Sequence, residues 1–160
     1  MKIDISKNFH MATFPVKVAS MNGMYKHVYN IVITDDTLDN GTLCGRGDYV
    51  SFDQYEQDEL PEGFAGRINE ASKSHKDYWY VEVTELPDDE VLYMYNSAVS
   101  EYVEKELQDE RLFVNEEDDV IQGAVLCVGD VIEVSKEGFT GTPAAGASVT
   151  FEDGKYKVGA

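Results

Sequence analysis

The 160-residue chain is poor in cysteine, with Cys44 and Cys127 as its only thiols. Neither lies in a CxxC pair or beside a histidine that would complete a metal site. Both have apolar neighbours in strand-like surroundings, which favours buried thiols, although a disulfide stays open if the two strands touch. Nothing in this cysteine usage requires an oxidising compartment.

Long hydrophobic runs are also lacking. No apolar stretch approaches the roughly 18 residues that a membrane span needs. The first residues, Met1 to Lys7, contain no apolar core of the kind found in a signal peptide. We therefore expect a soluble protein that is made in the cytoplasm of its host and has no membrane partner.

Motifs for catalysis or cofactor binding are absent from the sequence. It contains no P-loop, no HExxH and no Gly-x-Ser-x-Gly, and its histidines, at positions 10, 27 and 75, form no recognisable triad. The acidic run from Asp35 to Asn40 lacks the ligand spacing of an EF-hand, so a solvated loop is the favoured interpretation. We expect no catalytic, cofactor-binding or metal-binding residues, and no enzyme activity.

Positive charge is scarce, and the formal net charge is −18. Residues 1–26 nevertheless contain four lysines against Asp4 alone, a charge of about +3, which leaves about −21 on residues 27–160. Such an acidic body repels nucleic acid phosphates and favours solubility and basic partners. The sequence thus predicts an N-terminal arm (1–26) on an acidic body (27–160) that does not bind nucleic acid.

Short segments rich in Val, Ile, Tyr and Phe alternate with turn signals, a pattern typical of antiparallel strands. In the segment 78–84, Trp79, Val81 and Val83 fall on one face, which we expect to be the core face. The predicted fold class is mainly β, an antiparallel barrel or sandwich. Strands are expected at Lys26–Thr34, Tyr49–Asp53, Phe64–Ile68, Tyr78–Thr84, Val91–Tyr95, Ala124–Cys127, Val131–Ser135, Ser148–Glu152 and Lys155–Val158.

The last two segments predict a hairpin. Asp153-Gly154 suits a two-residue turn of type I′, in which both residues have positive φ. This turn would set Glu152 opposite Lys155, Phe151 opposite Tyr156 and Val149 opposite Val158. Opposite charges would then meet on one face and apolar side chains on the other.

One short helix is predicted near residues 97–109, where Val99, Tyr102, Val103 and Leu107 recur at helical spacing. A weak internal echo relates the segments 35–44 and 118–127, each followed by a Gly-Asp turn, at Gly47-Asp48 and Gly129-Asp130. The body can therefore also be divided into two related β units, 27–95 and 110–160, joined by the helix.

Two stretches resemble segments of the head decoration, or auxiliary capsid, proteins of tailed bacteriophages. These are Val28 to Gly41 with the following Gly-Asp-Tyr-Val, and Val128 to Pro143 with the short closing hairpin. The resemblance covers about half of the chain, and its motifs are turns rather than reactive groups. It implies a structural protein on the capsid surface of a virion, bound to the major capsid protein, often as a small homo-oligomer, that stabilises the shell.

The expected capsid contacts lie in the N-terminal arm, at Phe14, Pro15, Val16 and Lys17. An extended segment there could add a strand to a capsid subunit, because such pairing gains affinity from main-chain hydrogen bonds. Two alternatives remain open: an acidic mimic of DNA that inhibits a nucleic-acid-binding protein, and a hydrolase that depends on two facing carboxylates.

Overall fold

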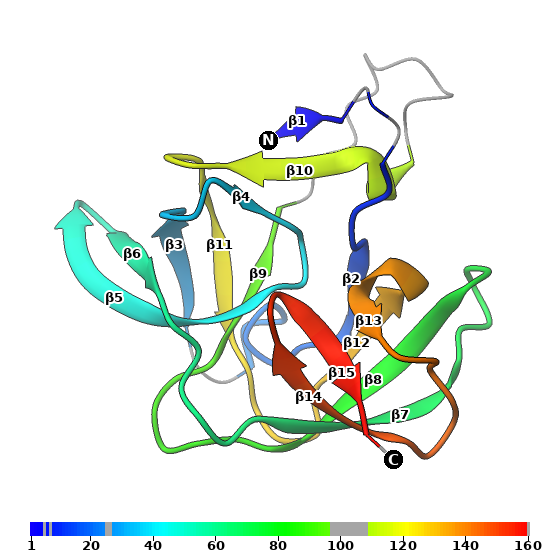
Figure 1. Ribbon diagram of the computed structural model, residues 1–160. Helices are drawn as coiled ribbons and strands as arrows, with labels where there is room; N and C mark the ends of the chain where they lie inside the picture. Colours follow the sequence, from blue (N-terminus) through cyan, green and yellow to red (C-terminus); the bar gives the residue numbers. More distant parts are fainter. Residues whose placement is uncertain (5, 7, 25–26, 97–108, 160) are drawn as a thin grey trace.

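The computed structural model describes residues 1–4, 6, 8–24, 27–96 and 109–159, and the fold is mainly β, as expected (Figure 1). Most strand pairs are antiparallel, while β3 with β6 and β13 with β15 are parallel. The strands are β1 (Lys2–Ile3), β2 (Thr13–Lys17), β3 (Val28–Val32), β4 (Thr37–Leu38), β5 (Leu43–Ser51), β6 (Gln54–Asp58), β7 (Ala65–Ala71), β8 (Tyr78–Glu85), β9 (Leu92–Tyr95), β10 (Phe113–Glu116), β11 (Val120–Val125), β12 (Val131–Ser135), β13 (Phe139–Thr140), β14 (Ser148–Glu152) and β15 (Lys155–Val158).

Five strands close into a small barrel in the order β11-β3-β6-β5-β9. Its interior is filled by aliphatic side chains and one thiol, because these strands direct alternate residues inward. The buried residues of this core are Ile31, Ile33, Leu38, Cys44, Leu92, Met94, Ile121 and Val125. Cys44 is buried and free, so it forms no disulfide with Cys127.

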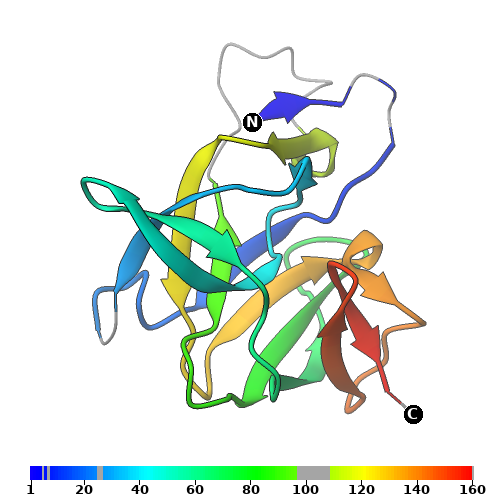
Figure 2. The same ribbon diagram turned by 60° about the vertical axis from the view of Figure 1, so that its left-hand side comes forward.

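A seven-stranded sheet lies beside the barrel, with the strand order β13-β15-β14-β7-β8-β12-β2 (Figure 2). A second apolar cluster joins the sheet and the barrel. Val81 and Val83 on β8 are buried there, as the alternation of that strand predicts. Trp79 packs against the same cluster but is only partly buried, whereas its neighbour Tyr78 is buried. The sheet therefore follows the predicted face along most of β8.

Two segments of the predicted N-terminal arm, β1 and β2, are incorporated into the sheets. β1 pairs with β10, which also pairs with β4, and β2 pairs with β12 at the edge of the seven-stranded sheet. Met11 and Val18, which flank β2, are buried in the apolar cluster. The change in charge near residue 26 consequently does not coincide with a boundary between an arm and a body.

The two sheets also do not follow the division into 27–95 and 110–160. β11, from the second of these segments, closes the barrel, while β7 and β8, from the first, form the centre of the seven-stranded sheet. Of the helix predicted near 97–109, residues 97–108 lie outside the described residues. Asp109 caps a short 3-10 helix, Glu110–Leu112, by accepting a hydrogen bond from the Arg111 amide.

The C-terminal hairpin has the predicted register. β14 and β15 pair Glu152 with Lys155, Phe151 with Tyr156 and Val149 with Val158. The turn residues have positive φ, 50° at Asp153 and 73° at Gly154, as a type I′ turn requires. The ion pair of Glu152 is diagonal, because its carboxylate lies 2.8 Å from Lys157 rather than against Lys155.

The segment around Tyr49 was predicted incorrectly. The strand begins at Leu43 rather than Tyr49, and Gly47-Asp48 lies within β5 rather than in a turn. The turn falls at Phe52-Asp53, inside the strand that was expected to run from Tyr49 to Asp53, and β6 begins at Gln54. Glycine is required at position 45 for β5 to approach Glu59, since a Cβ on Gly45 would lie 2.5 Å from the Glu59 carbonyl oxygen.

Candidate functional site

The residues expected to contact a capsid form the edge strand β2. Phe14 is partly buried, with its ring stacked on His75 at a centroid distance of 4.8 Å and next to Tyr78 at 5.9 Å. Val16 and Lys17 are exposed. Of the four predicted residues, these last two are therefore the most accessible, while Phe14 is engaged within the chain.

Pro15 limits what the outer edge of β2 can bind. The Ser135 amide donates to the Ala12 carbonyl at 2.9 Å, so alternation along the strand turns the backbone of Phe14 toward β12 and that of Pro15 away from it. Proline has no N–H, and it is typical of edge strands that resist pairing. An added strand would find no donor at Pro15, which makes β2 a poor template for strand addition.

The sequence analysis missed a more exposed apolar surface at the end of the β5–β6 hairpin, which projects from the barrel in both views (Figures 1 and 2). Three large apolar side chains lie there within four residues: Tyr49 is 63% exposed, Val50 46% and Phe52 91%. We call these three residues the hairpin tip. Its only signal in the sequence is an apolar residue, Phe52, directly before an Asp that adopts positive φ in the turn.

Aromatic stacking supports the hairpin tip from below. The Tyr49 ring meets Tyr55 edge-on at 5.8 Å, and Tyr55 meets Tyr29 edge-on at 5.4 Å. The Arg46 guanidinium carbon lies 4.5 Å from the centre of the Tyr29 ring and 4.9 Å from that of Tyr55. Such contacts stabilise partly exposed sites by about 0.5–1 kcal/mol each, and together they hold the hairpin against β3.

The turn itself is tied to the barrel. Asp53 adopts φ 56°, a conformation that Asp tolerates better than most residues. Its carboxylate accepts a hydrogen bond of 3.0 Å from the Asn30 side-chain amide on β3. The hairpin tip therefore has a defined position relative to the barrel.

Carboxylates surround the base of the same hairpin. A cavity of about 450 Å³ is lined by Arg46 and by the acidic residues Asp58, Glu59, Asp88, Asp89 and Glu90. A neighbouring cavity of about 540 Å³ lies between β5, β6 and the C-terminal hairpin. Cys44 lines this second cavity, and burial raises the pKa of its thiol to about 12, so the thiol stays protonated and poorly nucleophilic near neutral pH.

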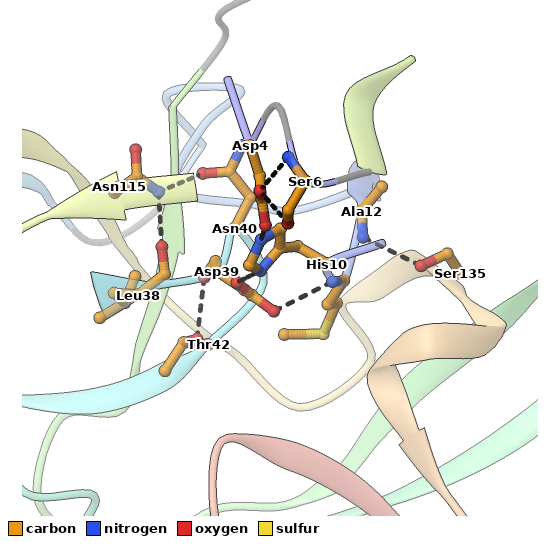
Figure 3. Close-up of polar contacts among 11 residues, drawn as sticks. Asp4, Ser6, His10, Ala12, Leu38, Asp39, Asn40, Thr42, Asn115 and Ser135 are labelled. Carbon is orange, nitrogen blue, oxygen red and sulfur yellow. Dashed lines mark hydrogen bonds and ion pairs between the residues drawn. The ribbon is translucent and has the colours of Figure 1, made fainter. Parts of the chain in front are cut away.

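A polar junction joins the N-terminal segment to the loop before β5 (Figure 3). The two ring nitrogens of His10 lie 2.9 Å from Asp4 and 2.9 Å from Asp39, and Asp39 also accepts a hydrogen bond of 3.0 Å from the Met11 amide. Both ring nitrogens can donate at once only in the charged imidazolium. The expectation that Asp39 belongs to a solvated loop is thus wrong for this residue, which is anchored through His10.

Two asparagines extend the junction into the interior. The Asn115 side-chain amide donates to the Leu38 carbonyl at 3.0 Å and to the Asn40 side-chain oxygen at 2.9 Å (Figure 3). Asn40 in turn donates to the Asn96 carbonyl at 2.9 Å. Asn40 is buried, although the sequence suggested an exposed loop, because its amide satisfies backbone groups between strands.

The pKa of Asp4 in this junction does not suit a general acid. Hydrogen bonds from Ser6 and then from His10 lower the pKa of Asp4 to about 2, whereas a general acid needs a raised pKa. Near neutral pH Asp4 is therefore a carboxylate held by its donors. The arrangement suits a structural clamp on the N-terminal segment.

A second group that brings serine, histidine and carboxylate together also has the wrong connectivity for a nucleophile. The buried Glu133 carboxylate accepts a hydrogen bond from the Ser72 hydroxyl and lies 2.8 Å from His75 Nδ1. In a catalytic triad the serine hydroxyl would bond to the imidazole instead. Glu133 thus fixes the loop between β7 and β8.

Among the described residues, no three His, Cys, Asp or Glu side chains are grouped so that they could hold a metal ion. No helix in the described part of the chain has the length and apolar character to cross a membrane. In comparisons with known proteins, no family model, no curated protein and no solved structure matches this chain.

Proposed function

We propose that this chain is a structural protein that binds the outer surface of an assembled bacteriophage head and stabilises it. The hairpin tip is the observation that supports this proposal most directly. Phe52 is 91% exposed at the end of a supported hairpin. Clustered apolar side chains on a protein surface mark sites of protein–protein contact.

The rest of the molecule suits such a contact role. A barrel and a seven-stranded sheet pack together, which provides a base for a projecting hairpin. The net charge of −18 favours solubility and a basic binding surface. Binding to a repeated shell surface requires these properties and no reactive group.

The choice of a phage head among possible assemblies rests on the resemblance of residues 28–41 and 128–143 to head decoration proteins. In the structure these segments contain β3 and β4, and β12 and β13, respectively. The partner would be the major capsid protein, the protein would reside on the capsid surface of the virion, and a small homo-oligomer would match the repeat of a shell.

The proposal can be tested with purified heads that lack the protein. Added protein should co-sediment with the heads, saturate at a fixed ratio to the major capsid protein, and raise the temperature at which the heads release DNA. Heads saturated with bovine serum albumin provide the control. Absence of binding, or binding without any change in head stability, would contradict the proposed function.

A DNA mimic is the second candidate, and the acidic cavity beside Arg46 favours it, because five acidic residues line this cavity. In that case the protein should bind a basic DNA-binding protein and compete with duplex DNA, and its affinity should fall steeply with added salt. Fluorescence anisotropy of labelled duplex DNA bound to a bacterial nucleoid protein would show that competition.

A further inference from the structure

We propose that the hairpin tip inserts into an apolar pocket on the partner protein whose rim carries lysine or arginine side chains. This inference rests on the proposed function, because it specifies the surface through which the chain would bind a shell. It commits to a partner of opposite charge, and it excludes a second copy of this chain as the occupant of the same site.

The apolar part of the argument is the shape and exposure of the hairpin tip. Phe52 lies in the turn with almost its whole side chain in water, and Tyr49 and Val50 precede it at the end of β5. Burying a side chain of this kind contributes about 1.5–3 kcal/mol, and aromatic anchors in pockets dominate many interfaces. A projecting end with three apolar side chains fits a concave surface better than a flat one.

The hairpin is also held in place before any partner binds. The rings of Tyr29, Tyr55 and Tyr49 form a row of edge-on contacts, and the Asn30 amide binds the Asp53 carboxylate in the turn. A segment that is ordered in advance loses less conformational entropy on association. The anchors therefore reach a partner with their positions already set.

The charges on the hairpin indicate which side chains should line the rim of the partner's pocket. Asp48, Asp53 and Glu56 are exposed on the hairpin around the apolar side chains. The only cationic residue on β5 and β6 is Arg46, and its guanidinium is occupied by two tyrosine rings and by Glu90 at 3.8 Å. A basic rim would meet these carboxylates favourably, whereas a second copy would bring like charges together.

The test compares substitutions at the hairpin tip with a matched substitution elsewhere. Phe52→Ser should weaken binding to the heads at least about tenfold, as expected for an anchor residue. Val128→Ser is the control, because Val128 is 63% exposed in the turn between β11 and β12, away from the hairpin. Its affinity should remain within about twofold of the wild-type value.

A second comparison isolates the charge. The double variant Asp48→Asn, Glu56→Gln removes two exposed carboxylates without changing the apolar side chains. Its association rate should fall, and the dependence of that rate on salt should weaken, in stopped-flow or surface-plasmon measurements on immobilised heads. Thermal unfolding of each variant confirms that the fold is retained.

The outcomes separate this inference from the proposed function. If the wild-type protein binds heads and Phe52→Ser binds equally well, the inference is overturned while the proposed function stands. If the association rate of the double variant depends on salt as strongly as that of the wild-type protein, the proposal of a basic rim is overturned. If the wild-type protein does not bind heads, both proposals fail.

Discussion

The two hairpins β14–β15 and β5–β6 turn in a similar way but place their apolar side chains differently. Each has an Asp with positive φ in its turn, with φ 50° at Asp153 and 56° at Asp53. The C-terminal hairpin directs Tyr156 into the core, where it is fully buried, while the β5–β6 hairpin leaves Phe52 almost fully in water. One hairpin contributes to the core, and the other leaves its apolar side chain exposed for the contact that we propose.

The two hairpins also differ in the regularity of their strand pairing. β14 and β15 pair without interruption, so alternate residues stay on the core face along the whole hairpin. β5 shifts its register on β6 between Arg46 and Tyr49 and again between Tyr49 and Ser51. Such irregularities redirect side chains and are frequent at functional sites, so the broken pattern is informative about function.

The largest expected effect breaks the C-terminal hairpin. Tyr156→Ala should lower the free energy of unfolding by about 3–5 kcal/mol, because it removes a buried ring that contacts Phe64, Phe139 and Phe151. Tyr156→Phe keeps the ring but loses the 2.8 Å hydrogen bond to the Gly41 carbonyl, and should cost about 1 kcal/mol. Guanidinium unfolding measures the free energy of unfolding of both variants. Equal losses in the two variants would show that packing of the ring contributes nothing beyond the hydrogen bond, contrary to this prediction.

Alkaline pH should destabilise the fold through two buried groups, Cys44 on β5 and Tyr78 on β8. Burial raises the pKa of Cys44 from 9.0 to about 12 and that of Tyr78 from 10.0 to about 12. The folded chain then keeps protons that the unfolded chain has released. The contribution of each group to stability is therefore intact below the pKa that the group has in the unfolded chain. It is lost as the pH rises from that value toward 12.

For Cys44 alone the expected loss is about 1.4 kcal/mol for each pH unit above 9 within this interval. Unfolding curves at pH 8, 9, 10 and 11 would measure it. The Cys44→Ala variant should show a weaker dependence on pH between 9 and 10 than the wild-type protein. An identical dependence in both proteins would show that Cys44 does not contribute.

A smaller effect is expected from the turn of the C-terminal hairpin. Gly154→Ala should lower the free energy of unfolding by about 1 kcal/mol, because φ at this position is 73° and alanine is strained there. An added Cβ would meet no atom within 4 Å, so backbone strain is the only expected cause. Asp153→Asn is the matched control, since Asn tolerates positive φ. If thermal unfolding shows a lower melting temperature for Asp153→Asn than for Gly154→Ala, the requirement for a type I′ turn is contradicted.

The smallest effect on stability is expected at the hairpin tip. Phe52→Ser should change the free energy of unfolding by less than about 0.5 kcal/mol, because the side chain makes little contact with the folded chain. Urea unfolding beside the wild-type protein would show this. A loss as large as that of Tyr156→Phe would mean that Phe52 packs against the fold, and the contrast between the hairpins would disappear.

Several elements could be predicted because their signals are local. Val81 and Val83 alternate with polar residues, and Asp153-Gly154 requires positive φ at two successive positions, so the burial of β8 and the register of the last hairpin follow from neighbouring residues. The polar junction gave no such signal. Asp39 and Asn40 look like exposed loop residues until His10 and Asn115, distant in the sequence, are brought against them.

The sequence by itself determined that this chain is a mainly β protein with a strong negative charge, because alternation, turn residues and composition act over a few residues. Only the tertiary structure decided which strands close the barrel and that Met11 and Val18 belong to the core. It also decided that Phe52, rather than Phe14, stands in water. The closure of the barrel and the burial of Met11 and Val18 depend on pairing between strands that are distant in the sequence, such as β11 with β3 and β2 with β12.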